Sequence, residues 1–92
     1  MNLDGLDGIY PPEPSGDPSA LLELRRARER LDQVLDAMPT SLRAVFVLFE
    51  LDDMTMADIS KTTGLRPGTV ASRLRRARAF FSERVRNLER AT

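Results

Sequence analysis

The sequence predicts an all-α fold, a four-helix domain that ends in a helix-turn-helix. Three observations predict it. From Ala20 onward, apolar residues recur at spacings of three and four, which is the period of a helix that buries one face. No stretch alternates between apolar and polar residues as a half-buried strand does. Gly and Pro are frequent up to Pro18 and sparse after it, where they separate the apolar runs. The plan is winged-helix-like, with a three-helix core without strands.

The first part of the chain, residues 1–19, predicts a flexible acidic linker or tail. It holds four acidic residues and no Lys or Arg, and it is rich in residues that interrupt helices and strands. The folded domain is therefore expected over residues 20–92. The interrupting residues of the tail are Gly5, Gly8, Pro11, Pro12, Pro14, Gly16 and Pro18.

The first two helices are predicted on either side of Pro39. The first is expected to run from about Ser19 or Ala20 to Met38, with Ser19 as its cap. Pro39 interrupts the pattern and fits the first turn of the second helix. That second helix is so apolar that it is either nearly buried or docks a partner. The two apolar stripes are Leu24, Ala27, Leu31, Val34, Leu35 and Met38, then Leu42, Val45, Phe46 and Phe49, widened by Val47, Leu48 and Leu51.

The third and fourth helices are predicted from residues that begin and end helices. Thr55 precedes Asp58 by three residues, which is an imperfect capping box for a short helix that continues to Thr63. Gly64 is placed to end that helix in the left-handed conformation, and Pro67 fits the first turn of the next one. The inner stripe of the fourth helix is Val70, Leu74, Ala77, Phe81, Val85 and Leu88.

The segment from residue 56 to residue 74 has the layout of a helix-turn-helix, in which a short helix, a tight turn and a longer helix follow one another. Ser60 is small at the predicted crossing of the helices, Gly64 follows in the turn, and Val70 faces inward from the second helix. Ile59 and Leu65 complete the predicted contact. Each residue alone is a weak signal, and their combination with many Arg residues on the second helix makes it strong.

The formal net charge of zero is the sum of three very different segments. Residues 1–18 carry a charge of −4, and residues 19–60 carry five basic and eight acidic groups, which gives −3. Residues 61–92 carry nine basic and two acidic groups, which gives +7. Thirteen of the fourteen basic residues are Arg, whose planar donors suit phosphates and guanine edges. The C-terminal third therefore suits a nucleic-acid partner.

Composition also excludes several classes of function. The chain has no Cys and no His, so disulfides, thiolate chemistry and imidazole catalysis are excluded, and no metal, cofactor or small-molecule substrate is expected. A chain of 92 residues has little room for an active-site cavity. The longest apolar stretch, residues 44–49, is too short to span a bilayer, and the start lacks a signal-peptide pattern. We expect a cytoplasmic protein that is not an enzyme and has no membrane partner.

Candidate DNA-binding residues lie on the fourth helix, opposite its apolar stripe. Arg pairs with guanine, hydroxyls contact bases or backbone, and a helix fits the major groove. The amides near Gly68 and Thr69 are expected to donate to one phosphate. A solvated basic helix without a DNA partner is the competing interpretation. The candidates are Ser72, Arg73, Arg75 and Arg76, followed by Thr69 and Arg66, whereas Arg78, Arg84 and Arg86 suit backbone contact or pairing on the helix surface.

Four segments resemble region 4 of sigma-70-family factors, especially the extracytoplasmic-function group. They are LDAMP at 35–39, RAVFVL at 43–48, MADIS at 56–60 and GLRPGTVASRLRRAR at 64–78. The resemblance covers about residues 31–88. Three positions depart from the family pattern: Ala71 replaces a frequent Lys or Arg, Asp58 a common Glu, and Ser60 a common Ala. The first departure puts one DNA contact in doubt, and the other two are mild.

The resemblance implies a four-helix domain whose last helix enters the major groove of the −35 promoter element. It also implies that the domain rests on the β flap of RNA polymerase, and that an anti-sigma factor is a further partner. Phe46 and Phe49 are the candidates for flap docking, although core packing is the simpler interpretation of both. Region 2 of the family does not fit in 92 residues. The chain is thus an excised C-terminal domain or a stand-alone relative, and we favour the excised domain.

Two alternatives remain open on the sequence. A response-regulator output domain has a similar four-helix plan, but its last helix dimerises, whereas the last helix here ends in mixed charge. A helical protein-interaction module would use the apolar second helix to dock a partner and the Arg residues only for solubility. Salt separates the second alternative from DNA binding, because a protein that neutralises several phosphates releases DNA as salt rises.

Overall fold

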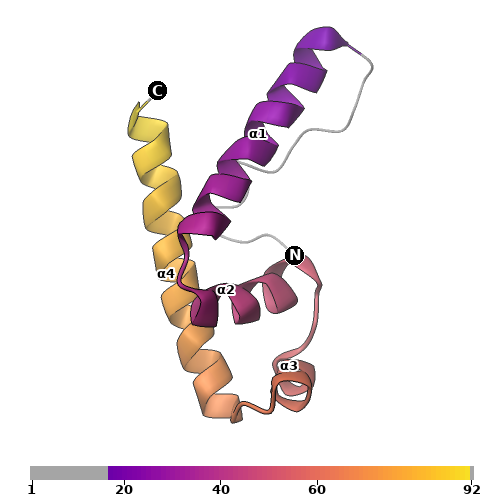
Figure 1. Cartoon of the computed structure of the whole chain (residues 1–92), viewed down its shortest axis with the longest axis vertical. Helices are drawn as coiled ribbons and strands as arrows, with labels where there is room; N and C mark the ends of the chain where they lie inside the picture. The colour runs from indigo at the N-terminus through magenta and orange to yellow at the C-terminus, as the bar shows by residue number, and fades with distance from the viewer. Residues whose placement is uncertain (1–16, 92) are drawn as a thin grey trace. The chain divides into compact units, whose positions relative to one another are not determined.

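The chain is all-α over residues 17–91, the part that the computed structural model describes (Figure 1). The N-terminal residues 1–16, which hold most of the predicted tail, lie outside the described residues. The elements are α1 (Pro18–Ala37), α2 (Thr40–Phe46), the π-helical turn η1 (Val47–Leu51), α3 (Met56–Thr63) and α4 (Pro67–Ala91). The predicted four-helix fold without strands is therefore confirmed for the described residues.

The described residues divide into two compact units. One unit contains α1 and the part of α4 that begins at Ser82, and the other is Met38–Phe81, which we call the helix-turn-helix unit. In the first unit, the buried apolar side chains are Ala27, Leu31 and Val34 of α1 and Val85 of α4. Their spacing of three and four within α1 is the stripe that the sequence predicts.

The first helix begins one residue before the predicted range, and its cap is Asp17 instead of Ser19. The Ser19 amide donates to Asp17 Oδ1 at 3.2 Å, and the Leu21 amide donates to the Asp17 carbonyl at 3.0 Å. Pro18 occupies the first helical position, where a missing N–H costs nothing, and Asp is a strong cap. The prediction of Ser19 as cap is therefore wrong by two residues.

The second helix begins at Thr40, with Pro39 as its N-cap and not within its first turn as predicted, and it then widens. The Pro39 carbonyl accepts from the amides of Leu42 at 3.0 Å and Arg43 at 2.9 Å. From Val47 the helix is a π-helix, with the Asp52 amide donating to the Val47 carbonyl at 3.0 Å, five residues earlier. A π-helix is rare and occurs mostly as one turn within an α-helix, often at a functional site. This turn changes which side chains after it face inward.

The third helix and the turn after it have the predicted start and end. Thr55 Oγ1 accepts from the Asp58 amide at 3.1 Å, which confirms the cap. Gly64 has a φ of 76°, the left-handed conformation, and its amide donates to the Ser60 carbonyl at 2.9 Å. Pro67 is the first residue of α4, also as predicted. The short-range signals of the sequence therefore define this part of the chain well.

The core of the helix-turn-helix unit joins α2, α3 and α4. Val45, Ile59 and Val70, one from each helix, are fully buried and form one cluster. The Phe46 and Phe81 rings stack, with centroids 5.0 Å apart. These contacts fix the beginning of α4 against α3 and α2. Partly buried Leu48, Phe49, Met54 and Leu65 pack around the cluster.

Candidate nucleic-acid interface

Hydroxyl groups on both sides of the α3–α4 turn hold its backbone in place. Ser60 Oγ donates to the Leu65 carbonyl at 2.5 Å, and Thr63 Oγ1 donates to the Ile59 carbonyl at 2.7 Å. Thr63 Oγ1 also accepts from the Leu65 amide at 3.2 Å. Backbone groups near a helix end need such partners. The sequence predicts only that Ser60 is small where the two helices cross. Its hydrogen bond to the Leu65 carbonyl is an additional role.

The candidate reading face is a stripe on the N-terminal half of α4, away from the buried Val70 and Leu74. Helical residues spaced by three, four and seven lie on one face. The structure therefore brings four of the predicted site residues together along this stripe. They are Thr69, Ser72, Arg73 and Arg76, and we call them the reading face.

The side chains of the predicted site differ in exposure. Arg76 of the reading face is exposed, whereas Thr69, Ser72 and Arg73 are half-buried at its edges and base. Arg75 is exposed beside the reading face, and Arg66 is exposed just before α4 begins. None of the four Arg side chains makes an ion pair with another residue in the described range 17–91. Their guanidinium donors are therefore available to a ligand.

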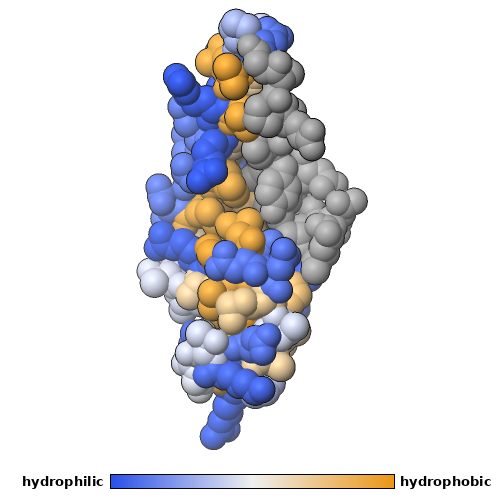
Figure 2. Space-filling model, turned by 90° about the vertical axis from the view of Figure 1, so that its right-hand side faces the viewer, coloured by the Kyte–Doolittle hydropathy of each residue, from blue (hydrophilic) through white to orange (hydrophobic). Residues whose placement is uncertain are grey.

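The face of the molecule in Figure 2 carries hydrophilic and near-neutral residues at its lower end, with a few apolar ones between them. Single exposed Arg residues are common on helices and indicate little alone. A row of unpaired Arg next to hydroxyl side chains, on a helix whose position is fixed by a tight turn, provides the donors that bind phosphate and guanine. The arrangement is therefore chemically suited to the major groove of DNA.

The amide of Thr69 does not serve as predicted. It donates to the Arg66 carbonyl at 2.9 Å, and the Val70 amide donates to the same carbonyl at 3.0 Å. The expectation that the Thr69 amide binds a phosphate is therefore wrong, because the first turn of α4 already uses it. Gly68 has open space around it, since a Cβ atom built there would meet no atom within 4 Å.

An ion pair links α4 to η1 and was not predicted. Arg78 Nε donates to Glu50 Oε1 at 2.5 Å, and the Arg78 guanidinium lies 5.4 Å from the centre of the Phe49 ring. The Glu50 side chain is 1% exposed, whereas that of Arg78 is 48% exposed. Glu50 Oε2 is buried and has no hydrogen-bond partner among the described residues. The only sequence signal was an acidic residue inside an apolar run.

The two predicted docking residues differ from the prediction. Phe46 is 2% exposed and stacks on Phe81, so it belongs to the core and offers no surface to a partner. Phe49 is half-buried and lies under the Arg78 guanidinium. The simpler interpretation, core packing, is therefore confirmed for Phe46, and its assignment to docking is wrong.

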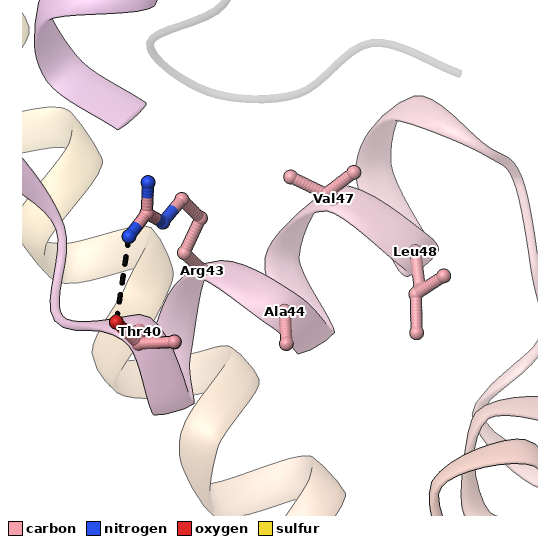
Figure 3. Close-up of a pocket in the computed structure, with 5 residues that line it drawn as sticks. All are labelled: Thr40, Arg43, Ala44, Val47 and Leu48. Carbon is pink, nitrogen blue, oxygen red and sulfur yellow. Dashed lines mark hydrogen bonds between the residues drawn. The ribbon is translucent and has the colours of Figure 1, made fainter. Parts of the chain in front are cut away.

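A shallow apolar pocket lies instead on the outer side of α2 and η1 (Figure 3). Arg43 folds back toward the start of the helix, where its Nη2 donates to Thr40 Oγ1 at 3.4 Å. This leaves Ala44, Val47 and Leu48 as the apolar lining. Ala44 is exposed, and the other two are half-buried. We call these three residues the α2 groove.

No helix among residues 17–91 is long and apolar enough to cross a membrane.

The fold defines a protein of the helix-turn-helix class. The family described as Sigma-70, region 4 matches residues 28–81, which is more than half of the chain, and the chain belongs to this family. It is 30% identical over 80 residues to the ECF RNA polymerase sigma factor SigE of Mycolicibacterium smegmatis (strain ATCC 700084 / mc(2)155). That alignment covers 85% of this chain and 31% of the relative. No solved structure matches the chain.

The family assignment decides between the open alternatives for the fold. The chain is region 4 of a sigma factor of the extracytoplasmic-function type, and not a response-regulator output domain. Helix-turn-helix domains of this family act in transcription initiation. The chain spans about a third of the length of the relative named above.

Proposed function

We propose that this domain recognises the −35 element of a promoter and so helps a sigma factor direct RNA polymerase to start transcription. The observation that carries the proposal is the reading face of α4, with the exposed Arg76 and its neighbouring hydroxyls. This face follows in sequence the turn that Gly64 and Ser60 hold in place. A helix held in this way enters the major groove with its N-terminal residues at the base edges. Its role is binding, without catalysis.

The contacts divide by chemistry. Arg73 and Arg76 point from the same face of α4 and are proposed to read guanine by two hydrogen bonds each. Ser72 and Thr69 supply hydroxyls for bases or sugar-phosphate oxygens. Arg66 and Arg75, which flank the face, are proposed to hold phosphates and so set the register of α4 on the duplex.

We further propose that the β flap of RNA polymerase docks on the α2 groove. Ala44, Val47 and Leu48 give an apolar surface on the helix-turn-helix unit, and none of the three belongs to the reading face. A domain that contacts polymerase and DNA through separate surfaces gains effective concentration from each. An anti-sigma factor is a further proposed partner, and the cytoplasm, where polymerase acts, is the proposed location.

The test is a fluorescence-anisotropy titration of the 92-residue chain with duplexes selected from a promoter-upstream library and with scrambled duplexes. Each is measured at two salt concentrations, with and without a β-flap fragment. The proposal expects preference for the selected duplexes and weaker binding at higher salt, with the β-flap fragment present or absent. Equal affinity for selected and scrambled duplexes would contradict it.

The α2 groove also favours a second function, a protein-interaction module that docks polymerase without reading DNA. The same titration separates the two functions. Flap binding with no duplex preference at either salt concentration supports the interaction module, whereas salt-sensitive selective binding supports promoter recognition.

A further inference from the structure

We propose that Glu50 is a positioning residue for DNA recognition, which acts through Arg78 to fix the rotation of α4 about its own axis. The proposal rests on the proposed function, because it concerns how the reading face is presented to the duplex. It is built on the ion pair between the two residues, the burial of Glu50 and the π-helical turn that carries it.

The apolar contacts of α4 fix its place against α2 and α3, and the ion pair adds a directional contact beyond the stacked rings of Phe46 and Phe81. Val70, Leu74 and Ala77 are buried apolar side chains, and the hydrophobic contacts that they make have no preferred direction. The hydrogen bond from Arg78 Nε to Glu50 Oε1 is directional, and it joins α4 to a segment outside the helix-turn-helix pair. It is therefore a contact of α4 that a roll of the helix would break.

The position of the pair along α4 makes it effective. Arg78 is two residues after Arg76, a rise of about 3 Å along the helix. A rotation that Glu50 prevents at Arg78 is therefore prevented at Arg73 and Arg76 as well, because the helix between them is continuous. Bidentate contact with a base tolerates little misalignment, so the rotation of α4 decides whether these Arg residues can read guanine.

A role in stability alone explains the pair poorly. Burying a carboxylate costs free energy that an ion pair often does not recover, and apolar residues of similar size are often as stable. Glu50 is buried with its Oε2 unpartnered among the described residues, so part of its desolvation is uncompensated. Such groups can instead specify one arrangement among several of similar stability, and here that arrangement is the orientation of α4.

Arg78 is not proposed as a DNA contact. Its Nε is used by Glu50, and its guanidinium lies over Phe49, toward η1. Within α4, Arg78 is five residues after Arg73, which turns it well away from the reading face. Arg78 is therefore bound within the domain.

The experiment uses the whole chain in three forms: wild type, Glu50→Leu, and Val34→Ala as a control that removes buried apolar volume in the other unit. Affinities for selected and scrambled duplexes are measured at a temperature where melting curves show all three forms folded. Residual dipolar couplings of the backbone amides then compare the orientation of α4 with that of α3 in the free proteins, so one readout does not depend on DNA.

For Glu50→Leu we expect about a tenfold loss of affinity for the selected duplex, the size of one base contact. Affinity for the scrambled duplex is not reduced, because every Arg remains. The dipolar couplings of residues 69–76 no longer fit the wild-type orientation. Val34→Ala melts earlier but keeps its selectivity. If Glu50→Leu does not fold, Glu50→Leu combined with Arg78→Met replaces it, since this pair leaves no buried charge without a partner.

Unchanged selectivity and unchanged couplings in the Glu50 variant would overturn the positioning role while leaving the proposed function intact. Equal loss for both duplexes would also overturn it, because that result indicates general weakening. A wild-type chain without any duplex preference would overturn the proposed function, and the positioning role in DNA recognition with it.

Discussion

Asp53 adopts a backbone conformation that few residue types accept easily. Its φ is 56°, and it is the only non-glycine residue with positive φ in the described part of the chain. The left-handed conformation costs an L-residue roughly 1–2 kcal/mol, and Asp tolerates it better than most because its side chain can bond locally. Asp53 lies two residues after Leu51, the last residue of η1, so the chain accepts this cost where it leaves the π-helical turn.

Asp53→Gly is expected to stabilise the fold by about 0.5 kcal/mol. The glycine removes the left-handed cost, and its greater freedom in the unfolded chain cancels part of that gain. Asp53 is exposed, so no packing is lost. Chemical denaturation followed by circular dichroism measures the change, and a clear loss of stability would show that the Asp53 side chain makes a compensating interaction.

Gly64→Val is expected to destabilise the fold by about 1–2 kcal/mol. A Cβ atom at Gly64 would meet no atom within 4 Å, so the cost comes from the positive φ and not from a clash. Gly64→Asn is the matched control, because Asn enters this conformation more readily than Val. Thermal melting of the three proteins should rank them glycine, asparagine, valine, and equal melting would contradict the assigned turn.

Arg76→Ala is expected to weaken binding to the selected duplex by about 1–3 kcal/mol if Arg76 reads a base. The exposed side chain has no ion-pair partner among the described residues, so the melting temperature should hardly change. Arg90→Ala, in the last turn of α4, is the control for the loss of one positive charge. The same affinity in both variants would remove Arg76 from the reading face.

Single residues could be predicted from sequence where their partners are close along the chain. The cap at Thr55, the turn at Gly64 and the helix start at Pro67 each depend on the residue type and its immediate neighbours. Glu50 and Arg78 are 28 residues apart, and nothing local marks them as partners. Acidic residues are rarely buried, so the sequence alone predicts an exposed Glu50 even within an apolar run.

At the scale of the element, the π-helical turn explains why the buried side chains of the second helix differ from the predicted ones. In an uninterrupted α-helix, Phe49 is three residues after Phe46 and four after Val45, so it would lie on the buried face. The wider turn instead buries Glu50 and leaves Phe49 half-buried at the edge of the core. Hydrophobic periodicity assumes a constant twist, and therefore it could not show this change.

The α2 groove gives a prediction for the helix as a whole. Val47→Asp is expected to weaken β-flap binding about tenfold, because it places a charge in an apolar contact. DNA affinity of the free domain should remain, since Val47 is not on the reading face. Leu21→Asp, which changes an exposed leucine on α1, is the control. Loss of flap binding in the control alone would move the docking surface to α1.

At the scale of the whole molecule, the distribution of charge along the chain matters more for DNA binding than the net charge does. The net charge is zero, yet residues 61–92 carry nine basic and two acidic groups. A short-range contact with phosphates responds to the local excess, because charges farther away than about 10 Å are screened at ordinary salt. The acidic remainder of the chain therefore leaves the local positive charge of residues 61–92 effective at ordinary salt.

Arg75→Ala and Arg76→Ala are expected to differ in their salt dependence. The logarithm of the binding constant falls with the logarithm of salt by about 0.9 for each phosphate contact. Loss of Arg75, a proposed phosphate contact, should therefore reduce the slope by about 1, whereas loss of a base contact at Arg76 should leave the slope and reduce the preference between duplexes. Titrations at four salt concentrations test this, and equal slopes would reassign Arg75.

The π-helical turn also determines how the chain tolerates changes in length. Such a turn holds one residue more than a turn of α-helix, so deleting one residue within Val47–Leu51 would leave a continuous, regular helix. The residues after the turn would keep their direction, because the deletion removes only the extra residue that the wider turn accommodates. When the deleted residue precedes Glu50, that carboxylate keeps its inward position. A domain shortened in this way would therefore keep its helix content and the alignment of its two proposed binding surfaces.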